Sequence, residues 1–324
     1  MSHNTPGRRW TAADMPDQRG RTVVITGANT GIGFETARAF ARHGATVVLA
    51  CRNPGKAADA AARIRTDASE AKLSTLQLDL ASLASVHRAA GRLRTEHARI
   101  DLLINNAGGI RTRYGRTEDG FELTLATNHL GPFALTGLVL DRLLAVPGSR
   151  VVTVSSIGHR RGTINFDDLQ SQRGYRSSTA YFQSKLANLM FTYELQRRLT
   201  AAGAQTIAVA AHPGNARTEF GREMSPFVRI MMSPRLRMFT WWLMQSPPMG
   251  ALAALRAAVD PDASGGDYYG PPGRAQFTGF PTRVESSALS HDGEAQRRLW
   301  RESERLTGIT YSTGESAGRQ ATPI

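Results

Sequence analysis

The stretch Val24-Ile25-Thr26-Gly27-Ala28-Asn29-Thr30-Gly31-Ile32-Gly33 decides the fold of this chain. It begins within a short apolar run, residues 22–25, that is typical of a buried strand, and it leads into a helical pattern over residues 32–43. Three glycines with the spacing G-x3-G-x-G fill the turn between the two. In this position, a glycine turn is the pattern by which a strand and a helix bind the phosphates of a dinucleotide.

Each glycine has a separate expected role in such a turn. Gly27 permits the tight turn, Gly31 the close approach of backbone to a pyrophosphate, and Gly33 the close packing of the helix. The free N–H groups at the start of the helix then bind phosphate oxygens. Glycines with this spacing also occur in purely structural turns, so the prediction depends on the motifs that follow along the chain.

Apolar runs alternate with helical patterns as far as residue 211, which is typical of a parallel sheet covered by helices on both faces. The predicted strands are residues 22–25, 46–50, 74–78, 102–104, 151–154 and 206–211, and the predicted helices are residues 32–43, 57–68, 83–96, 120–144 and 178–199. The pattern predicts an α/β fold, namely a single doubly wound (Rossmann-type) domain with a mainly parallel sheet.

We expect this domain to span residues 21–309, with an N-terminal extension at residues 1–20 and a flexible C-terminal tail at residues 310–324. A mobile helical substrate lid is expected at about residues 215–248, because flexible thioethers and flat rings crowd this segment. They are Met224, Phe227, Met231, Met232, Met238, Phe239, Trp241, Trp242 and Met244. Core packing, a dimer face, or contact of the neighbouring arginines with an anionic membrane surface are the alternatives for this segment.

Composition excludes several classes of protein. Because Cys51 is the single cysteine, an intramolecular disulfide and a thiolate metal cluster are excluded, as expected for a cytosolic enzyme. Residues 1–20 are polar and are typical of neither a signal peptide nor a membrane anchor. The net charge of +13 comes with scattered arginines and without a nucleic-acid-binding motif, so we expect no nucleic-acid partner.

Two asparagine motifs follow the glycine turn. Asn105-Asn106-Ala107-Gly108 comes directly after the predicted strand 102–104, at the edge where an open α/β sheet binds its ligands, and its small residues let a cofactor lie against backbone. A simple Asn-Gly-type turn is the alternative. Asn128 lies within a predicted helix although asparagine is a poor helix former, which indicates a kink or a water-binding role.

The chemistry is expected to reside in Ser156, Tyr181 and Lys185. Residues four apart share one face of a helix, so Tyr181 and Lys185 project together. We expect the ammonium group to lower the pKa of the phenol, which in a free tyrosine is about 10. Tyr181 then donates a proton to a developing alkoxide or accepts one from an alcohol.

Cofactor choice is expected to depend on the end of the second strand. An acidic residue there selects NAD, whereas NADP needs a cation for its 2′-phosphate, and this chain has Cys51-Arg52. NADP(H) is therefore preferred and NAD(H) remains possible, the alternative being that Arg52 is an ordinary solvated arginine. Asp79 is expected near the adenine ring, or else as part of a helix cap with Ser82.

In combination, these motifs resemble the short-chain dehydrogenase/reductase superfamily, and specifically its retinol-dehydrogenase-like branch, over about residues 20–306. The resemblance rests on the glycine turn, Ala50-Cys51-Arg52-Asn53, Leu103-Ile104-Asn105-Asn106-Ala107-Gly108, Asn128-His129-Leu130-Gly131, Val154-Ser155-Ser156, Tyr181-Phe182-Gln183-Ser184-Lys185-Leu186-Ala187-Asn188 and His212-Pro213-Gly214.

The resemblance implies a nicotinamide cofactor, no metal, and a role for each motif residue. Ser156 orients the carbonyl oxygen and Tyr181 is the acid/base. Lys185 holds the nicotinamide ribose and tunes Tyr181, while Asn128 supports a proton-relay water. The implied cofactor-binding residues are Gly27, Asn29, Thr30, Gly31, Ile32, Gly33, Arg52, Asp79, Leu80, Asn106, Ala107, Gly108, Tyr181, Lys185, Pro213, Gly214 and Thr218.

Two segments depart from the family pattern. Thr30 stands where many NADP-using relatives carry a basic residue, which leaves more of the selectivity to Arg52. Residues 158–178 form a long, arginine-rich segment with Asp167-Asp168, either a wall of the site or a surface excursion.

The expected function is reversible hydride transfer between NADP(H) and a lipophilic aldehyde, ketone or alcohol in the cytoplasm or at a membrane surface, by a homo-oligomer. One alternative is reduction of a carbon–carbon double bond, as in the protochlorophyllide reductases that share Tyr-x-x-x-Lys. Cys51 lies in the cofactor region and offers no proton donor for that reaction. The other alternative is a non-catalytic NADP(H) sensor, which would have little reason to retain Ser156, Tyr181 and Lys185 together.

Overall fold

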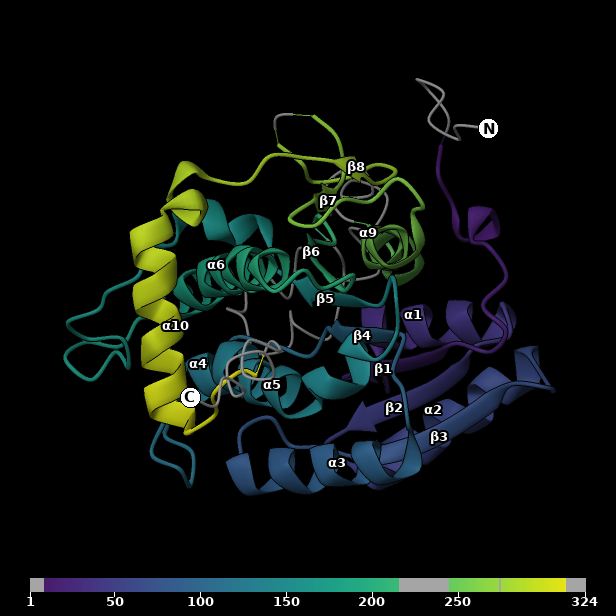
Figure 1. Cartoon of the computed structure of the whole chain (residues 1–324). Helices are drawn as coiled ribbons and strands as arrows, with labels where there is room; N and C mark the ends of the chain where they lie inside the picture. The colour runs from purple at the N-terminus through teal and green to yellow at the C-terminus, as the bar shows by residue number, and fades with distance from the viewer. Residues whose placement is uncertain (1–8, 216–244, 274, 313–324) are drawn as a thin grey trace, which may run out of the picture.

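The computed structural model describes residues 9–215, 245–273 and 275–312 of the 324-residue chain (Figure 1). Most of the predicted lid, including Thr218, lies outside these ranges.

The centre of the structure is an eight-stranded sheet with the strand order β3-β2-β1-β4-β5-β6-β7-β8. Its first seven strands in this order are parallel, and β8 pairs antiparallel with β7. The strands are β1 (Thr22–Thr26), β2 (Thr46–Cys51), β3 (Lys72–Gln77), β4 (Leu102–Asn105), β5 (Arg150–Val154), β6 (Ile207–Ala211), β7 (Tyr268–Gly270) and β8 (Thr282–Arg283). This order confirms the predicted doubly wound, mainly parallel sheet.

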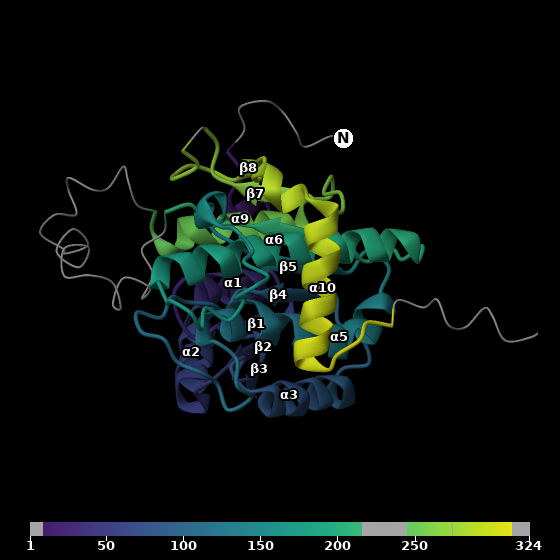
Figure 2. The same cartoon turned by 90° about the vertical axis from the view of Figure 1, so that its left-hand side faces the viewer.

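Helices cover both faces of the sheet (Figures 1 and 2). The α-helices are α1 (Gly31–Arg42), α2 (Pro54–Asp67), α3 (Leu83–Glu96), α4 (Leu123–Leu125), α5 (Gly131–Leu144), α6 (Ser177–Ala201), α9 (Pro247–Val259) and α10 (Gly293–Thr307). Shorter turns are η1 (Ala12–Asp14), the π-helical turn η2 (Ala126–Leu130), η3 (Ile157–Arg161) and η6 (Ala288–His291).

Alternation along the strands divides the core between the two faces. Val23 and Ile25 pack in the cluster formed with α1, α2 and α9, whereas Val24 packs in the cluster formed with α3, α5 and α10. All three side chains are fully buried. Because both faces of β1 are covered, its sequence is a continuous apolar run rather than an alternating one.

The predicted helix at residues 120–144 is interrupted. The structure has a three-residue α4, then the π-helical η2, and only then α5. Asn128 lies within η2, so the expected kink is present. By length and composition the run Leu123–Leu144 could cross a membrane, but 78% of its most apolar window is buried inside the protein, as in a core helix.

Residues beyond both expected ends of the domain also contact it. Trp10 packs against the core, Met15 and Gln18 are buried, and the Gln18 N–H donates to His43 O at 2.9 Å, so the ordered domain begins before residue 21. At the other end, the Tyr311 hydroxyl donates to Phe133 O at 2.6 Å, beyond the expected boundary at residue 309. Polar composition alone does not reveal these contacts.

Candidate active site

The candidate site lies at the carboxyl ends of the central strands. β1 and β4 are neighbours in the sheet although β2 and β3 lie between them in sequence, so the chain leaves β1 and β4 in opposite directions. Open α/β sheets bind ligands in the crevice at this switch point. The segments that follow β1, β4, β5 and β6 start from this edge, and each carries predicted site residues.

The glycine turn after β1 requires glycine for steric reasons. Gly27 has a φ of +68°, a conformation that strains other residues. A Cβ on Gly33 would overlap the carbonyl oxygen of Gly27 and would lie 2.5 Å from Asn106 Nδ2. The start of α1 therefore packs against the turn and against the segment that follows β4.

Asn106 binds the end of β1 through hydrogen bonds from its side chain and its backbone. Its Nδ2 donates to Thr26 O at 2.8 Å, and its backbone N–H donates to Thr26 Oγ1 at 3.0 Å. The N–H of Ala107 donates to the same hydroxyl at 2.9 Å. Asn106 thus joins β1 to β4, and the motif leaves Ala107 and Gly108 as the backbone that faces the crevice edge.

The first turn of α1 fits a dinucleotide phosphate. α1 has 12 residues, and its N-cap residue Thr30 is exposed and makes no side-chain capping hydrogen bond. The first N–H groups of a helix have no partner within the helix and are favourable partners for an anion. Ile32 is buried beneath this turn, and the N–H of Asn29 is directed to the thiol of Cys51.

Of the residues expected to bind the adenosine part of the cofactor, some already have hydrogen-bond partners within the protein and others do not. Arg52 is exposed at the end of β2 and makes no ion pair or hydrogen bond with any residue in the described ranges. Asp79 Oδ1 already accepts the Ala81 N–H at 3.0 Å, while Ser82 caps α3. Leu80 is buried, and its carbonyl packs against Gly131.

Ser156 and Tyr181 meet through a hydrogen bond. Ser156 is the N-cap residue of η3, and its Oγ accepts the Gly158 N–H at 3.1 Å. Tyr181 projects from α6. Burial raises the pKa of Tyr181 to about 12, and the hydrogen bond from Ser156 acts in the opposite direction. Tyr181 is therefore a phenol at neutral pH and can act as a proton donor.

Lys185 corrects one expectation from the sequence. Its ammonium does not lower the pKa of Tyr181 in the protein alone, because Nζ donates to Val154 O at 3.0 Å and lies 5.8 Å from the centre of the Tyr181 ring. Lys185 is only 4% exposed, and burial lowers its own pKa to about 8. A Cβ on Gly108 would lie 3.2 Å from Nζ, so Lys185 reaches the backbone that follows β4.

Asn128 links the same backbone to α6. Its Oδ1 accepts the Gly109 N–H at 2.8 Å, and its Nδ2 donates to Gly109 O and to Ser184 Oγ, both at 2.9 Å. Ser184 Oγ in turn donates to Tyr181 O at 2.8 Å. Because π-helical turns are frequent at functional sites, the break at η2 is consistent with this position. The structure thus brings Asn128, Ser156, Tyr181 and Lys185 together.

Pro213 and Gly214 follow β6 at the same edge. The Gly214 N–H donates to His212 Nδ1 at 3.2 Å, and Gln245 Nε2 donates to Pro213 O at 2.8 Å. Gln245 therefore ties this segment to the residues that precede α9. Gln245 was not predicted, because its hydrogen bond to Pro213 O joins two segments that no local motif links. Ser184 was predicted only as part of the motif from Tyr181 to Asn188, and its hydrogen bond to Tyr181 O was not expected.

The segment 158–178 combines the two expected alternatives. Both Asp168 carboxylate oxygens accept backbone N–H groups of a surface turn, and these bonds to Arg173 and Gln172 lower the pKa of Asp168. Tyr175, in contrast, donates to Arg111 O at 2.6 Å and so contacts the loop after β4. Residues 168–173 therefore form a surface excursion, whereas Tyr175, near the end of the segment, is placed to form a wall.

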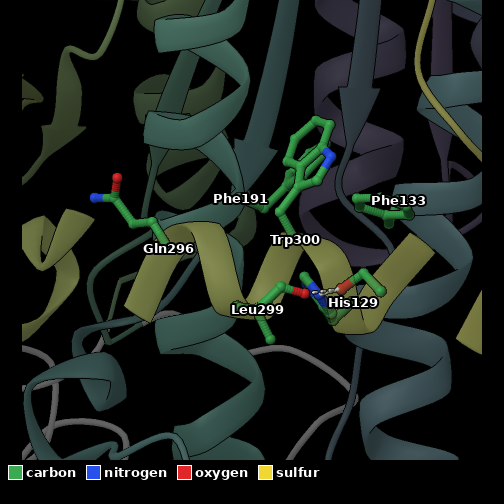
Figure 3. Close-up of a pocket in the computed structure, with 7 residues that line it drawn as sticks. His129, Phe133, Phe191, Gln296, Leu299 and Trp300 are labelled. Carbon is green, nitrogen blue, oxygen red and sulfur yellow. Dashed lines mark hydrogen bonds between the residues drawn. The ribbon is translucent and has the colours of Figure 1, made fainter. Parts of the chain in front are cut away.

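A small, narrow pocket lies beneath α10 (Figure 3). Its lining is mostly apolar: His129, Phe133, Phe191, Gln296, Leu299, Trp300 and Ser303. His129 Nε2 pairs with Ser303 Oγ at 2.8 Å, and burial lowers the pKa of His129 to about 4. The imidazole is a buried, neutral packing group, and the pocket contains none of the candidate catalytic side chains.

Comparisons with known proteins agree with this geometry. The family model of the short chain dehydrogenases matches residues 21–228. The chain is 42% identical to Retinol dehydrogenase 13 of Homo sapiens over 293 residues. The matched region covers 90% of this chain and 85% of that protein. An uncharacterized protein from Mycobacterium Paratuberculosis has a crystal structure with a TM-score of 0.78 at 42% identity, covering 94% of this chain and 100% of that one. L-Sorbose reductase from Gluconobacter frateurii, complexed with NADPH and L-sorbose, shares the fold at a TM-score of 0.66 and 19% identity, over 82% of this chain and 99% of that one.

Proposed function

Because this chain belongs to the short-chain dehydrogenase/reductase family, whose members are NAD(P)-dependent oxidoreductases acting on CH–OH or carbonyl groups, we propose a specific reaction for its site. The protein transfers hydride reversibly between NADP(H) and a lipophilic aldehyde, ketone or alcohol, with Tyr181 as the acid/base. One observation carries this proposal: the Ser156–Tyr181 hydrogen bond lies at the carboxyl edge of the sheet, where Lys185 and Asn128 both reach the backbone at residues 108–109.

The chain's own groups divide the work of reduction. When bound, the nicotinamide supplies or accepts the hydride. The Ser156 hydroxyl orients the substrate oxygen, and Tyr181 gives it a proton as the alkoxide develops. Lys185 adds positive charge beside the phenol and holds the ribose. The glycine turn, residues 106–108 and Pro213-Gly214 would hold the cofactor against backbone, and Thr218 is proposed to join them.

The protonation state of Tyr181 gives the reaction a direction-dependent pH profile. Since burial raises the pKa of Tyr181 to about 12, the phenol needed for reduction persists across the neutral range, whereas the phenolate needed for oxidation becomes more abundant as pH rises. Between about pH 6 and pH 7, below the pKa of about 8 at which Lys185 loses its charge, we expect kcat for reduction to stay level and kcat for oxidation to increase. Initial rates in both directions measure this, and oxidation that slows with rising pH would contradict it.

Arg52 is proposed to select NADP(H). Its guanidinium is exposed, and a charge-assisted hydrogen bond to a 2′-phosphate contributes about 1.5–3 kcal/mol. We expect Arg52→Ala to lower kcat/KM for NADPH at least about tenfold and to leave that for NADH unchanged. Arg88→Ala, which removes an exposed arginine from the middle of α3, is the control. Equal losses of kcat/KM with NADPH and NADH would show that Arg52 does not bind the 2′-phosphate.

Aromatic rings on two loops support a lipophilic substrate. Tyr114 is 40% exposed and packs edge-on against Tyr175, with ring centres 5.7 Å apart. Phe277 is equally exposed, and its carbonyl accepts the Asn215 N–H beside Pro213-Gly214. The relatives named retinol dehydrogenase point to the same class of substrate. Residues 215–248, most of which lie outside the described ranges, are proposed to complete this apolar wall as a lid.

The function is tested by NADPH oxidation with a panel of lipophilic and polar carbonyl compounds. Faster turnover of the lipophilic aldehydes or ketones supports the proposal, and turnover confined to polar sugars would refute the substrate class. A cytoplasmic homo-oligomer is proposed, with peripheral membrane contact as the alternative. Light scattering gives the subunit number, and flotation with anionic liposomes decides on the membrane contact.

A further inference from the structure

His159 is a buried imidazole that contacts the backbone of the candidate site residue Ser156. It lies in η3, three residues after Ser156, and it is fully buried. Its Nδ1 is 2.7 Å from Ser156 O, and its Nε2 is 3.1 Å from the backbone nitrogen of Ser287. The ring also packs edge-on against Tyr268, with ring centres 5.6 Å apart. The proposed reaction assigns His159 no role.

The two backbone partners determine the protonation state of the ring. A carbonyl oxygen can only accept, so Nδ1 must carry a hydrogen to bond Ser156 O. A backbone N–H can only donate, so Nε2 must present a lone pair to Ser287. Only the neutral Nδ1–H tautomer satisfies both. Burial is also the main reason that the pKa of His159 falls to about 4.

The hydrogen bond to Ser287 is one of three that residues 285–287 make with η3 and α6. Arg160 Nη2 donates to Glu285 O at 2.8 Å, and the Tyr193 hydroxyl is 2.8 Å from Ser286 Oγ. Tyr193 lies on α6, the helix that carries Tyr181 and Lys185. Residues 285–287 therefore connect the turn that bears Ser156 to the helix that bears Tyr181.

We propose that His159 is a positioning residue that holds the Ser156 hydroxyl toward Tyr181 by tying Ser156 O to the backbone of residues 285–287. The inference rests on the role proposed for Ser156 above. Within η3, Ser156 O accepts the backbone N–H of His159 at 3.0 Å. The imidazole adds a second hydrogen bond to the same oxygen, and this bond also ties the turn to Ser287. Small displacements of a catalytic group are expensive, since an error of about 1 Å can cost about a hundredfold in rate.

Two substitutions separate the two bonds. Asparagine places its amide nitrogen near the position of Nδ1, so His159→Asn retains a donor for Ser156 O. Glutamine reaches the position of Nε2, so His159→Gln retains an acceptor for Ser287 and loses the donor. We expect His159→Gln to lower kcat about tenfold or more, with the Kd for NADPH unchanged, and His159→Asn to recover most of that loss.

The matched control is His43→Gln. His43 Nδ1 also bonds a backbone carbonyl, Ala39 O at 2.8 Å, but at the end of α1 that lies away from the site. We expect this variant to retain the wild-type kcat. Equal losses in His159→Gln, His159→Asn and His43→Gln would overturn the proposal, as would a loss in His159→Gln that appears only in NADPH affinity.

A double-mutant cycle tests whether His159 acts through Ser156. In a Ser156→Ala background, His159→Gln should change the residual kcat by less than about twofold, because the hydroxyl that it positions is gone. Independent, multiplicative losses would show that His159 acts elsewhere.

One measurement needs no substrate. The ¹⁵N spectrum of histidine-labelled protein, assigned with His159→Asn, should show a neutral Nδ1–H imidazole. An Nε2–H tautomer or a protonated ring would overturn the proposal even if carbonyl reduction is confirmed. Conversely, a wild-type protein that reduces no carbonyl compound would refute the proposed function, while the tautomer of His159 would still be read from this spectrum.

Discussion

Replacing Tyr181 by phenylalanine is expected to lower kcat by about 10² to 10⁴-fold, the range that a positioned general acid contributes. The substitution removes only the hydroxyl, which bonds Ser156 and donates the proton. The ring remains, so the packing beside Phe182, with ring centres 6.1 Å apart, is retained. Stopped-flow or steady-state rates with NADPH give kcat, and quenching of NADPH fluorescence gives the Kd, which we expect to be nearly unchanged.

Tyr311→Phe is the matched control for this prediction. It also removes a tyrosine hydroxyl with a hydrogen bond, here to Phe133 O, but on the face of the sheet covered by α5 and α10. We expect wild-type kcat in this variant. Full activity in Tyr181→Phe, or an equal loss in both variants, would refute the assignment of Tyr181 as the acid.

Replacing Lys185 by methionine is expected to impair two steps. The ammonium is removed from beside Tyr181 and from the backbone at Gly108, where the ribose is proposed to bind. We expect kcat to fall by about 10² to 10³-fold, as when a single charge-stabilising group is removed, together with a higher Kd for NADPH. The combined loss distinguishes this variant from Tyr181→Phe. An unchanged Kd would leave Lys185 without the proposed contact to the cofactor.

The same variant should be more stable than the wild type at pH 7. Burial lowers the pKa of Lys185 to about 8 in the folded protein, against about 10.4 for an unfolded lysine. Below pH 8 Lys185 is charged in both states, so the buried charge lowers the free energy of unfolding by its full cost. As pH rises from about 8 to about 10, Lys185 loses its proton in the folded state before it does in the unfolded state, and this cost is relieved. We expect the gap in the free energy of unfolding between Lys185→Met and wild type to narrow over this range. A gap that widens would mean that Lys185 stabilises the fold.

The central sheet could be predicted from the sequence because its signals are local. Strands β1, β2, β4, β5 and β6 are largely apolar runs bounded by turn residues, and they were expected close to where they lie. β3, with the sequence KLSTLQ, is more polar, and it was expected at residues 74–78 rather than at Lys72–Gln77. β7 and β8, with three and two residues, are too short to produce such a pattern. The clear alternation of apolar runs and helical patterns stops after residue 211, so α9 and α10 were not expected. Both pack on helices that lie far before them in the sequence.

The candidate site was predictable to a similar extent. Motif spacing placed Ser156, Tyr181 and Lys185 in one site, but it predicted a lowered pKa for Tyr181, whereas burial raises the pKa of Tyr181 in the protein alone. The direction of this shift depends on burial and on the bond from Lys185 to Val154 O, which are properties of tertiary structure. The role inferred for His159 depends on Ser287, 128 residues away, and no local pattern contains that information.

The most direct test of the account is the fate of a deuterium label. NADPH carrying deuterium at carbon four of the nicotinamide is incubated with the wild-type protein and an unsaturated lipophilic aldehyde, and the product is analysed by NMR. Hydride transfer to the carbonyl carbon, as proposed, gives an allylic alcohol with deuterium on the carbinol carbon and an intact double bond. Deuterium on a former double-bond carbon, with the carbonyl group retained, would contradict it.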